Sequence, residues 1–138
     1  MNYFKIKTRP IKGTNPAEIT KKAMYEFHIV EKRSRRLPSV RCKALGGSRI
    51  FLGEYINHQG QKTPLDRRRR LRFLPCAIDL LENTNLKPTT KVNPNTRETL
   101  YRLYGVAGNG EKFVVQVAEN PKTGNKRLMS SFPIDRTK

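Results

Sequence analysis

Hydrophobic and polar residues alternate with a period of two along the C-terminal third of the chain, which is the pattern of half-buried strands. The segments with this pattern are 100–106, 112–118 and 127–132. Turn-forming residues separate them, at 108–110 and at 120–125. The residues expected to share a face are Phe113, Val115 and Val117 in the second segment and Leu128, Ser130 and Phe132 in the third. The pattern predicts a three-stranded antiparallel meander.

Apolar residues recur at helical spacing in two regions, and the first follows Asn15. Asn15 is suited to cap the helix, Pro16 to open it, and Glu18 to lie in its first turn. The residues expected on its apolar face are Ala17, Ala23, Met24, Phe27 and Val30. The basic run 32–36 closes this helix, where cations suit the negative end of the helix dipole. It is either a solvated last turn or a direct phosphate contact.

The second helical region begins at Thr63, with Thr63 as the N-cap, Pro64 at the first position and Asp66 in the first turn. The apolar stripe consists of Leu65, Leu71, Leu74, Ile78 and Leu81. Pro75 is expected to kink or split this helix, because proline removes a main-chain hydrogen bond. Five arginines within residues 67–72 wrap well over one turn, so at least two of them must point away from the core.

The remaining segments carry weaker patterns. Residues 3–7 are expected to form a short strand. Alternating apolar residues from Val40, followed by Gly46-Gly47 and the apolar residues 50–52, suggest a hairpin. Residues 57–60 are expected to form a polar loop, and residues 83–98 a polar linker that is too irregular for a helix.

These elements together predict the α+β class, with N-terminal helices packed on a small C-terminal antiparallel β-sheet. The length of 138 residues suits a single domain, 1–138, around one hydrophobic core. Hydrophobic residues make up 36% of the chain, and they cluster in periodic segments, which favours a folded core over general disorder.

The balance of basic and acidic residues is the strongest indication of a binding partner. The chain carries 29 Lys and Arg against 11 Asp and Glu, a formal net charge of +18. A compact domain this basic repels itself, so a polyanionic partner is expected. Nucleic acid is favoured over a membrane surface, because the sequence has no lipidation motif and no clear amphipathic anchor.

The two cysteines, Cys42 and Cys76, lie far apart in the sequence and have no metal-ligand spacing. They are expected to be reduced, partly buried thiols of a cytoplasmic protein, and neither a metal nor another cofactor is expected. The sequence has no apolar stretch suited to a signal peptide or a membrane span.

The order of certain motifs resembles a known group of enzymes. The motifs are Asn57-His58-Gln59-Gly60 before the arginine-rich segment 66–73, the segment from Phe73-Leu74-Pro75 into 78–83, and Tyr101-Arg102 followed by the Gly-Asn-Gly turn and the strands ending at Pro133. In this order they resemble the barnase, EndoU, colicin and RelE-like ribonuclease superfamily, in its phage-borne or polymorphic-toxin branch. The resemblance covers residues 50–135, as a ribonuclease-like core, and leaves 1–49 as a basic N-terminal helical segment. Related sequences tend to have Thr-Ala-Phe-Pro where this one has Ser130-Ser131-Phe132-Pro133, and the serine keeps the hydroxyl.

The resemblance implies a metal-independent, toxin-like endoribonuclease that cleaves RNA by 2′-OH attack on the adjacent phosphate. Transfer RNA and ribosomal RNA are candidate substrates. An acidic inhibitor or immunity protein is implied as a partner, because such an enzyme endangers its own cell.

Cleavage of this kind needs a general base, a general acid and cations at the phosphate. The catalytic candidates are His58, Ser130, Lys112 and Arg102. The nucleic-acid-binding candidates are Arg67, Arg68, Arg69, Arg70, Tyr101, Lys126 and Arg127. Tyr104 shares a strand with Tyr101, so one of the two must face the core and the other can stack on a base. His28, between apolar neighbours on the first helix, is expected to be structural.

Each candidate has a simpler interpretation. His58 can be an ordinary exposed loop histidine, Ser130 a plain strand serine, and each cation a solvated surface charge. The alternative function is therefore a non-catalytic RNA- or DNA-binding protein, associated with ribosomes or regulating a phage. A third hypothesis is a basic scaffold for an acidic protein partner. The sequence contains no P-loop, no dinucleotide-binding fingerprint, no zinc-protease motif and no nucleophile elbow.

Overall fold

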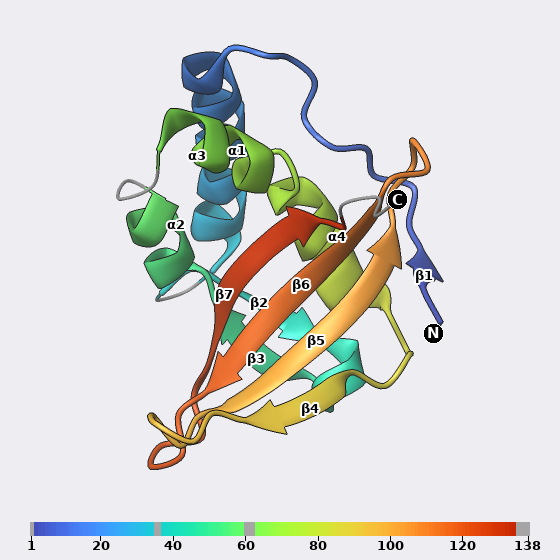
Figure 1. Cartoon of the computed structure of the whole chain (residues 1–138). Helices are drawn as coiled ribbons and strands as arrows, with labels where there is room; N and C mark the ends of the chain where they lie inside the picture. Colours follow the sequence, from blue (N-terminus) through green and yellow to red (C-terminus); the bar gives the residue numbers. More distant parts are fainter. Residues whose placement is uncertain (1, 35–36, 60–62, 135–138) are drawn as a thin grey trace.

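The computed structural model describes residues 2–34, 37–59 and 63–134, with the main chain alone at His58 and Gln59. Helices and strands are interspersed in the first half of the chain, and in the second half two further helices are followed by four strands (Figure 1). The first half contains β1 (Phe4–Lys5), α1 (Pro16–Arg33), β2 (Ser39–Cys42), the 3-10 turn η1 (Lys43–Leu45), β3 (Ser48–Phe51) and α2 (Gly53–Gln59). The second half contains α3 (Pro64–Leu71), α4 (Leu74–Asn83), β4 (Thr89–Val92), β5 (Thr99–Val106), β6 (Lys112–Glu119) and β7 (Lys126–Pro133).

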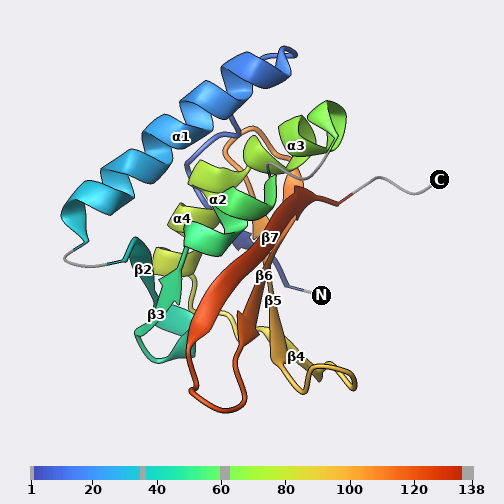
Figure 2. The same ribbon diagram turned by 90° about the vertical axis from the view of Figure 1, so that its left-hand side faces the viewer.

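The described strands form one seven-stranded mixed sheet in the order β1-β5-β6-β7-β3-β2, with β4 also paired to β5. The pairs β1–β5 and β3–β7 are parallel, and the other pairs are antiparallel. Helix α4 contacts both β5 and β2, which lie toward opposite edges of the sheet. The sheet therefore curls part of the way around α4, as the two views show (Figures 1 and 2).

The predicted fold class is wrong in its layout. The sheet is not a small C-terminal antiparallel unit beneath N-terminal helices, because β1, β2 and β3 come from the first 51 residues, with β1 before α1 and the other two strands between α1 and α2. Two of these strands join through parallel pairs, β1 beside β5 and β3 beside β7. Pairs between strands so distant in sequence leave no local signal, and strands of two to four residues show almost no periodicity.

The C-terminal meander is confirmed as β5, β6 and β7, and Phe113, Val115 and Val117 are all fully buried. The predicted face of the third strand is wrong. The pairing of β6 with β7 shifts by one residue between Gln116 and Val117, where β7 contains one extra residue, as in a β-bulge. The alternation along β7 changes there, so Leu128 and Ser131 are buried on the same side of the sheet. An extra residue in one strand reverses every side chain beyond it, and the alternation rule does not foresee it.

The start of α1 follows its sequence signals. The Asn15 side chain accepts hydrogen bonds from the main-chain nitrogens of Ala17, at 2.9 Å, and Glu18, at 3.3 Å. The buried residues of the helix are Ile19, Ala23, Phe27 and Val30, with Met24 partly buried. Ala17 is exposed, contrary to the prediction, and Ile19 takes its place on the buried face.

The second helical region is split as predicted, with α4 starting one residue before Pro75. Thr63 caps α3 by accepting a hydrogen bond from Asp66, at 3.3 Å. Leu65 is 66% exposed and so is not part of the apolar stripe, which begins at Leu71. Two further expectations are wrong: residues 57–59 are the end of helix α2 and not a loop, and the linker 83–98 contains strand β4.

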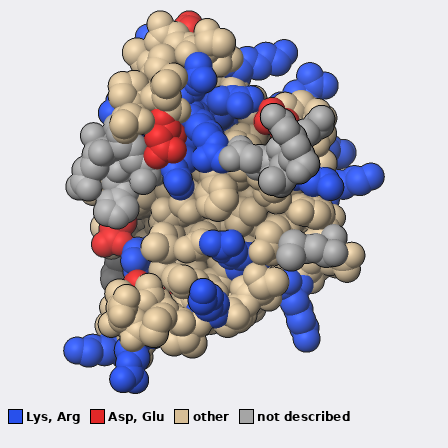
Figure 3. All heavy atoms as spheres, in the orientation of Figure 1, with Lys and Arg blue, Asp and Glu red and all other residues tan. Residues whose placement is uncertain are grey.

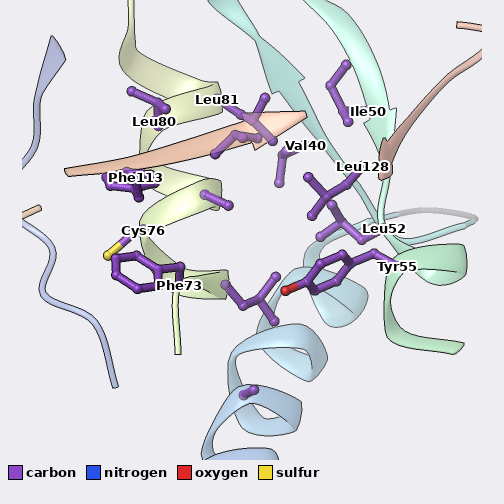
Figure 4. Close-up of a cluster of buried hydrophobic side chains, with 14 of the residues drawn as sticks. Val40, Ile50, Leu52, Tyr55, Phe73, Cys76, Leu80, Leu81, Phe113 and Leu128 are labelled. Atoms are coloured by element: carbon purple, nitrogen blue, oxygen red, sulfur yellow. The ribbon is translucent and has the colours of Figure 1, made fainter. Parts of the chain in front are cut away.

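The core lies between the sheet and helices α1 and α4, and Figure 4 shows its central side chains. Phe73 stacks on Phe113 with ring centroids 5.4 Å apart. A Cβ atom at Gly105 would lie 2.8 Å from the Phe113 ring, so only glycine lets β5 pass so close to it. Cys42 and Cys76 are buried and unpaired, and burial raises the pKa of both thiols, that of Cys76 to about 12. Both cysteines are more deeply buried than the sequence predicted, and their reduced state stays a prediction.

Candidate nucleic-acid interface

The strands β5, β6 and β7 have one face toward α4 and an opposite face, here called the outer face, which Figure 1 presents to the viewer. The strand register and alternation with the buried residues define its members. They are Leu100, Arg102 and Tyr104 of β5, Val114 and Gln116 of β6, and Ser130 and Phe132 of β7. Figure 3 shows this side: basic side chains gather where α3 meets the end of β7, more basic side chains are scattered across the sheet, and acidic ones are few.

Arg102, Gln116 and Ser130 form a polar row across the outer face, because the register places each opposite the next. The Arg102 Nε atom donates to Gln116 Oε1 at 3.0 Å, and Gln116 Nε2 donates to Met129 Sδ at 3.1 Å. Gln116 is only 9% exposed, since these two side chains lie against it. Arg102 is exposed, and its two terminal nitrogens keep donors for a ligand. Two of the predicted catalytic residues, Arg102 and Ser130, are thus brought together.

An aromatic and cationic cluster lies at one end of the same face. The rings of Tyr3 and Tyr104 meet edge to face, with centroids 5.8 Å apart. The Lys112 ammonium lies 4.8 Å from the Tyr3 ring centroid, and the Tyr104 hydroxyl is 3.4 Å from Thr89 Oγ1. Lys112 is four residues from Gln116 along β6, so it belongs to this cluster and not to the polar row.

Tyr101, predicted to bind nucleic acid, lies on the opposite side of β5 from Tyr104. It packs against the core, and its hydroxyl donates to Glu119 Oε1 at 2.7 Å. That hydrogen bond, together with burial, raises the pKa of Tyr101 to about 12. Tyr104 is therefore the tyrosine of this strand that is available for stacking.

The arginines of α3 have internal partners. Arg68 donates to the Thr14 carbonyl at 2.9 Å, and Arg69 lies 3.5 Å from the Pro133 carbonyl. Arg70 pairs with Asp66 at 3.3 Å, and its guanidinium lies over the Phe132 ring, 5.4 Å from the centroid. The helix thus ties the N-terminal segment and the end of β7 together while it holds positive charge at the rim of the outer face.

Tyr55 and Ser131 support this arrangement from inside. The buried Tyr55 hydroxyl donates to the Arg70 carbonyl at 3.1 Å and lies 3.0 Å from Ser131 Oγ. Burial raises the pKa of Tyr55 well above its ordinary range, so the hydroxyl stays neutral. Ser130, and not Ser131, is thereby left on the outer face.

Arg127 and Lys126, predicted to bind nucleic acid, both have acidic partners. Arg127 Nε lies 2.7 Å from Glu54 Oε2, and its terminal nitrogens pair with Glu98. The hydrogen bond from Arg127 is the main reason why the pKa of Glu98 is lowered. Lys126 Nζ lies 3.5 Å from Glu119 Oε1. Both cations are largely neutralised within the protein.

Two pockets flank the Arg127–Glu54 pair. One, of about 420 Å³, is lined by Glu54, Tyr55, Asn57, Arg127, Leu128 and Met129. The other, of about 480 Å³, shares Glu54, Asn57 and Arg127 and extends to the 120–126 turn.

His58 follows Asn57 in the last turn of α2, and its side chain lies outside the described residues. His28, expected to be structural, is exposed on α1, and its Nδ1 atom lies 3.0 Å from Glu31 Oε1.

Sequence reasoning missed Tyr3, Gln116, Glu54 and Glu98. Alternation along β6 was a usable signal for Gln116, because it is a polar residue between valines in a strand of apolar residues. The two glutamates carried no signal, since their common partner Arg127 is 29 residues or more away in the sequence.

Among the described residues, no group of three or more His, Cys, Asp or Glu side chains is placed to hold a metal ion. No helix in residues 2–34, 37–59 and 63–134 is long and apolar enough to cross a lipid bilayer. No protein-family model, no curated protein and no solved structure matches the chain.

Proposed function

We propose that this protein binds single-stranded RNA in the cytoplasm, on the outer face of the sheet. The observation that carries the proposal is the combination on one face of the polar row, Arg102, Gln116 and Ser130, with the Tyr3–Tyr104–Lys112 cluster. Sequence-tolerant binding of single strands requires these two parts, cations along the backbone and aromatic rings for the bases.

Each part has a distinct task. The Arg102 guanidinium and the Ser130 hydroxyl supply donors for phosphate oxygens. Tyr104 offers a ring for a base, while Lys112 contributes charge at the same end of the face. The net charge of +18, including the arginines of α3, draws a polyanion toward the face.

The test compares the half-buried Tyr104 with the exposed Tyr25. Tyr104→Ala removes the ring on the outer face, whereas Tyr25→Ala removes a ring that is 67% exposed on α1, away from that face. Affinity for a fluorescent single-stranded RNA is measured by anisotropy at fixed salt. Because stacking contributes about 1–3 kcal/mol per base, Tyr104→Ala is expected to weaken binding by about five- to 150-fold and Tyr25→Ala by less than about twofold. Equal losses of affinity in the two variants would show that the outer face is not the RNA-binding site.

A second candidate function is metal-independent RNA cleavage, favoured by the position of Arg102 and Ser130 on either side of Gln116. Donors in one row suit the oxygens of a phosphate that gains charge during the reaction. In this reaction the 2′-oxygen attacks the adjacent phosphorus, the bond to the 5′-oxygen breaks, and a 2′,3′-cyclic phosphate remains. A base takes the proton of the 2′-OH, and an acid gives one to the leaving 5′-oxygen. His58 is proposed for one of these two roles, and an acidic inhibitor would then be a partner.

Incubation of the protein with cellular RNA in EDTA tests cleavage, beside the His58→Ala and His28→Ala variants. Cleavage to cyclic-phosphate ends by the parent and by His28→Ala, but not by His58→Ala, is the expected result. Cleavage that requires Mg²⁺, or equal cleavage of DNA, would contradict it. Tight binding of RNA without cleavage by any of the three proteins would contradict the cleavage function and leave RNA binding as the one supported function.

A further inference from the structure

Two arginines face each other across the β2–β3 hairpin. Arg41 and Arg49 are directly paired in the antiparallel register, next to the pair Val40 and Ile50. Val40 and Ile50 are 3% and 0% exposed in the core, so alternation places both arginine side chains on the other side of the hairpin. Like charges directly opposite each other in a sheet are destabilising.

Among the residues that the structure describes, the two arginines have no acidic partner to offset this repulsion. Arg41 Nη1 donates to the Gly47 carbonyl at 3.1 Å, and Arg49 Nε donates to Ser39 Oγ at 3.2 Å. Both acceptors are uncharged. No carboxylate of the described residues lies within ion-pair distance of either guanidinium. Each guanidinium therefore keeps its charge and several unused N–H donors.

A pocket of about 470 Å³ lies beside this pair. It is lined by Arg33, Ser34, Ser39, Val40, Arg41, Arg49 and Glu82, from the end of α1, the hairpin and the end of α4. Glu82 is its one acidic residue and already pairs with Arg33 at 2.9 Å. Three arginines and one glutamate give the lining a net charge of +2. Figure 2 shows the end of α1 approaching β2, apart from β4, β5 and β6.

We propose that this pocket binds the phosphate group of a nucleotide. Arginine forks match phosphate oxygens in a bidentate manner, and the Ser39 hydroxyl, which accepts from Arg49 Nε, lines the same pocket. The volume falls in the range of small-molecule sites, which is enough for a mononucleotide. A bound phosphate lying between Arg41 and Arg49 turns their repulsion into two attractions. The site is separate from the outer face and does not depend on the function proposed there.

The experiment measures binding of adenosine 5′-monophosphate and of inorganic phosphate by calorimetry, with adenosine as the uncharged control. The protein is expected to bind both phosphates and not adenosine. The double variant Arg41→Gln/Arg49→Gln is expected to bind both at least about tenfold more weakly, since charge-assisted hydrogen bonds are lost. The matched control is Lys21→Gln/Lys22→Gln, which makes the same change of charge on the exposed side of α1 and is expected to bind as the parent does.

An equal loss in both double variants would mean general attraction of anions and would overturn the proposal, as would binding of adenosine alone. Thermal unfolding gives a second measurement: phosphate is expected to raise the Tm of the parent and of the lysine variant, but not that of the arginine variant. RNA carrying a 5′-phosphate, compared with 5′-hydroxyl RNA, shows whether the phosphate comes from an RNA end or from a free nucleotide. Tyr104→Ala is expected to leave mononucleotide binding intact, so failure of one proposal is separable from failure of the other.

Discussion

The arginines of α3 and the arginine pair of the β2–β3 hairpin differ in how their charge is used. Arg68 and Arg70 bind a main-chain carbonyl, a carboxylate and an aromatic ring within the protein. Arg41 and Arg49 face each other and donate to uncharged oxygens, and the Arg49 guanidinium also lies 5.8 Å from the Phe51 ring centroid, but neither has a carboxylate partner among the described residues. In the sequence, the run on α3 is the conspicuous basic motif, and the two hairpin arginines are isolated.

The difference shows that the density of cations along a chain is a poor guide to a ligand site. A guanidinium whose donors and charge already have partners stabilises the fold, and it adds to the long-range field without needing to touch a ligand. An unneutralised pair costs stability in the free protein, and a bound anion removes that cost. The following predictions test this contrast.

The largest effect is expected for Arg72→Ala. Arg72 donates to the Ile11 carbonyl at 3.1 Å and to Glu111 at 3.1 Å, and its guanidinium lies 5.5 Å from the Phe73 ring centroid. Its loss leaves a largely buried carbonyl without a donor, so the free energy of unfolding is expected to fall by about 2 kcal/mol in urea titrations. Arg41→Ala, the control, is expected to change it by less than about 0.5 kcal/mol. Similar decreases in the free energy of unfolding for the two variants would contradict the proposed difference between internally bonded arginines and the hairpin arginines.

A pH effect is expected from Glu98, the internal partner of Arg127. Arg127 lowers the pKa of Glu98 below the ordinary value of 4.5, so the folded protein binds fewer protons at this site than the unfolded chain. The resulting stabilisation is complete above pH 4.5 and is lost as the pH falls through the lowered pKa. The Tm of Glu98→Gln is expected to fall less steeply with acid in that window than the Tm of the parent. Parallel curves would show that the pair contributes nothing.

Salt dependence of RNA binding separates an exposed arginine from an internally bonded one. Each phosphate contact on a single strand contributes about 0.7 to the slope of log affinity against log salt. Arg102→Gln on the outer face is expected to reduce the slope by about that amount, and Arg68→Gln to leave it unchanged. The opposite ranking would place the RNA on α3.

The smallest effect is expected for Arg41→Glu, which converts the like-charge pair with Arg49 into an opposite-charge pair. Without phosphate, this variant is expected to be more stable than the parent by about 0.2–1 kcal/mol. The gain should shrink at high salt, because screening weakens exposed charge pairs. A loss of stability at low salt would mean that Arg41 and Arg49 do not repel each other in the free protein.

The sequence predicted those parts of the fold that short-range physics controls. Asn15 and Thr63 cap helices through hydrogen bonds to residues two or three positions on, and Pro75 separates α3 from α4. The meander was predictable because β5, β6 and β7 are joined by short turns. The sequence predicted strands at β1 and β3 but not their neighbours in the sheet, because their parallel partners are about 100 and 76 residues away, as in Phe4 with Gly105 and Ile50 with Lys126.

For the candidate site, the sequence by itself determined the net charge, the helix caps and the three long strands, and it required that one of Tyr101 and Tyr104 face the core. Only the tertiary structure decided which cations have internal partners and which face Ser130 occupies. The physical reason is range: a cap or an alternation is decided within a few residues, whereas Arg127 meets Glu54 and Glu98 only when segments distant in the sequence fold together.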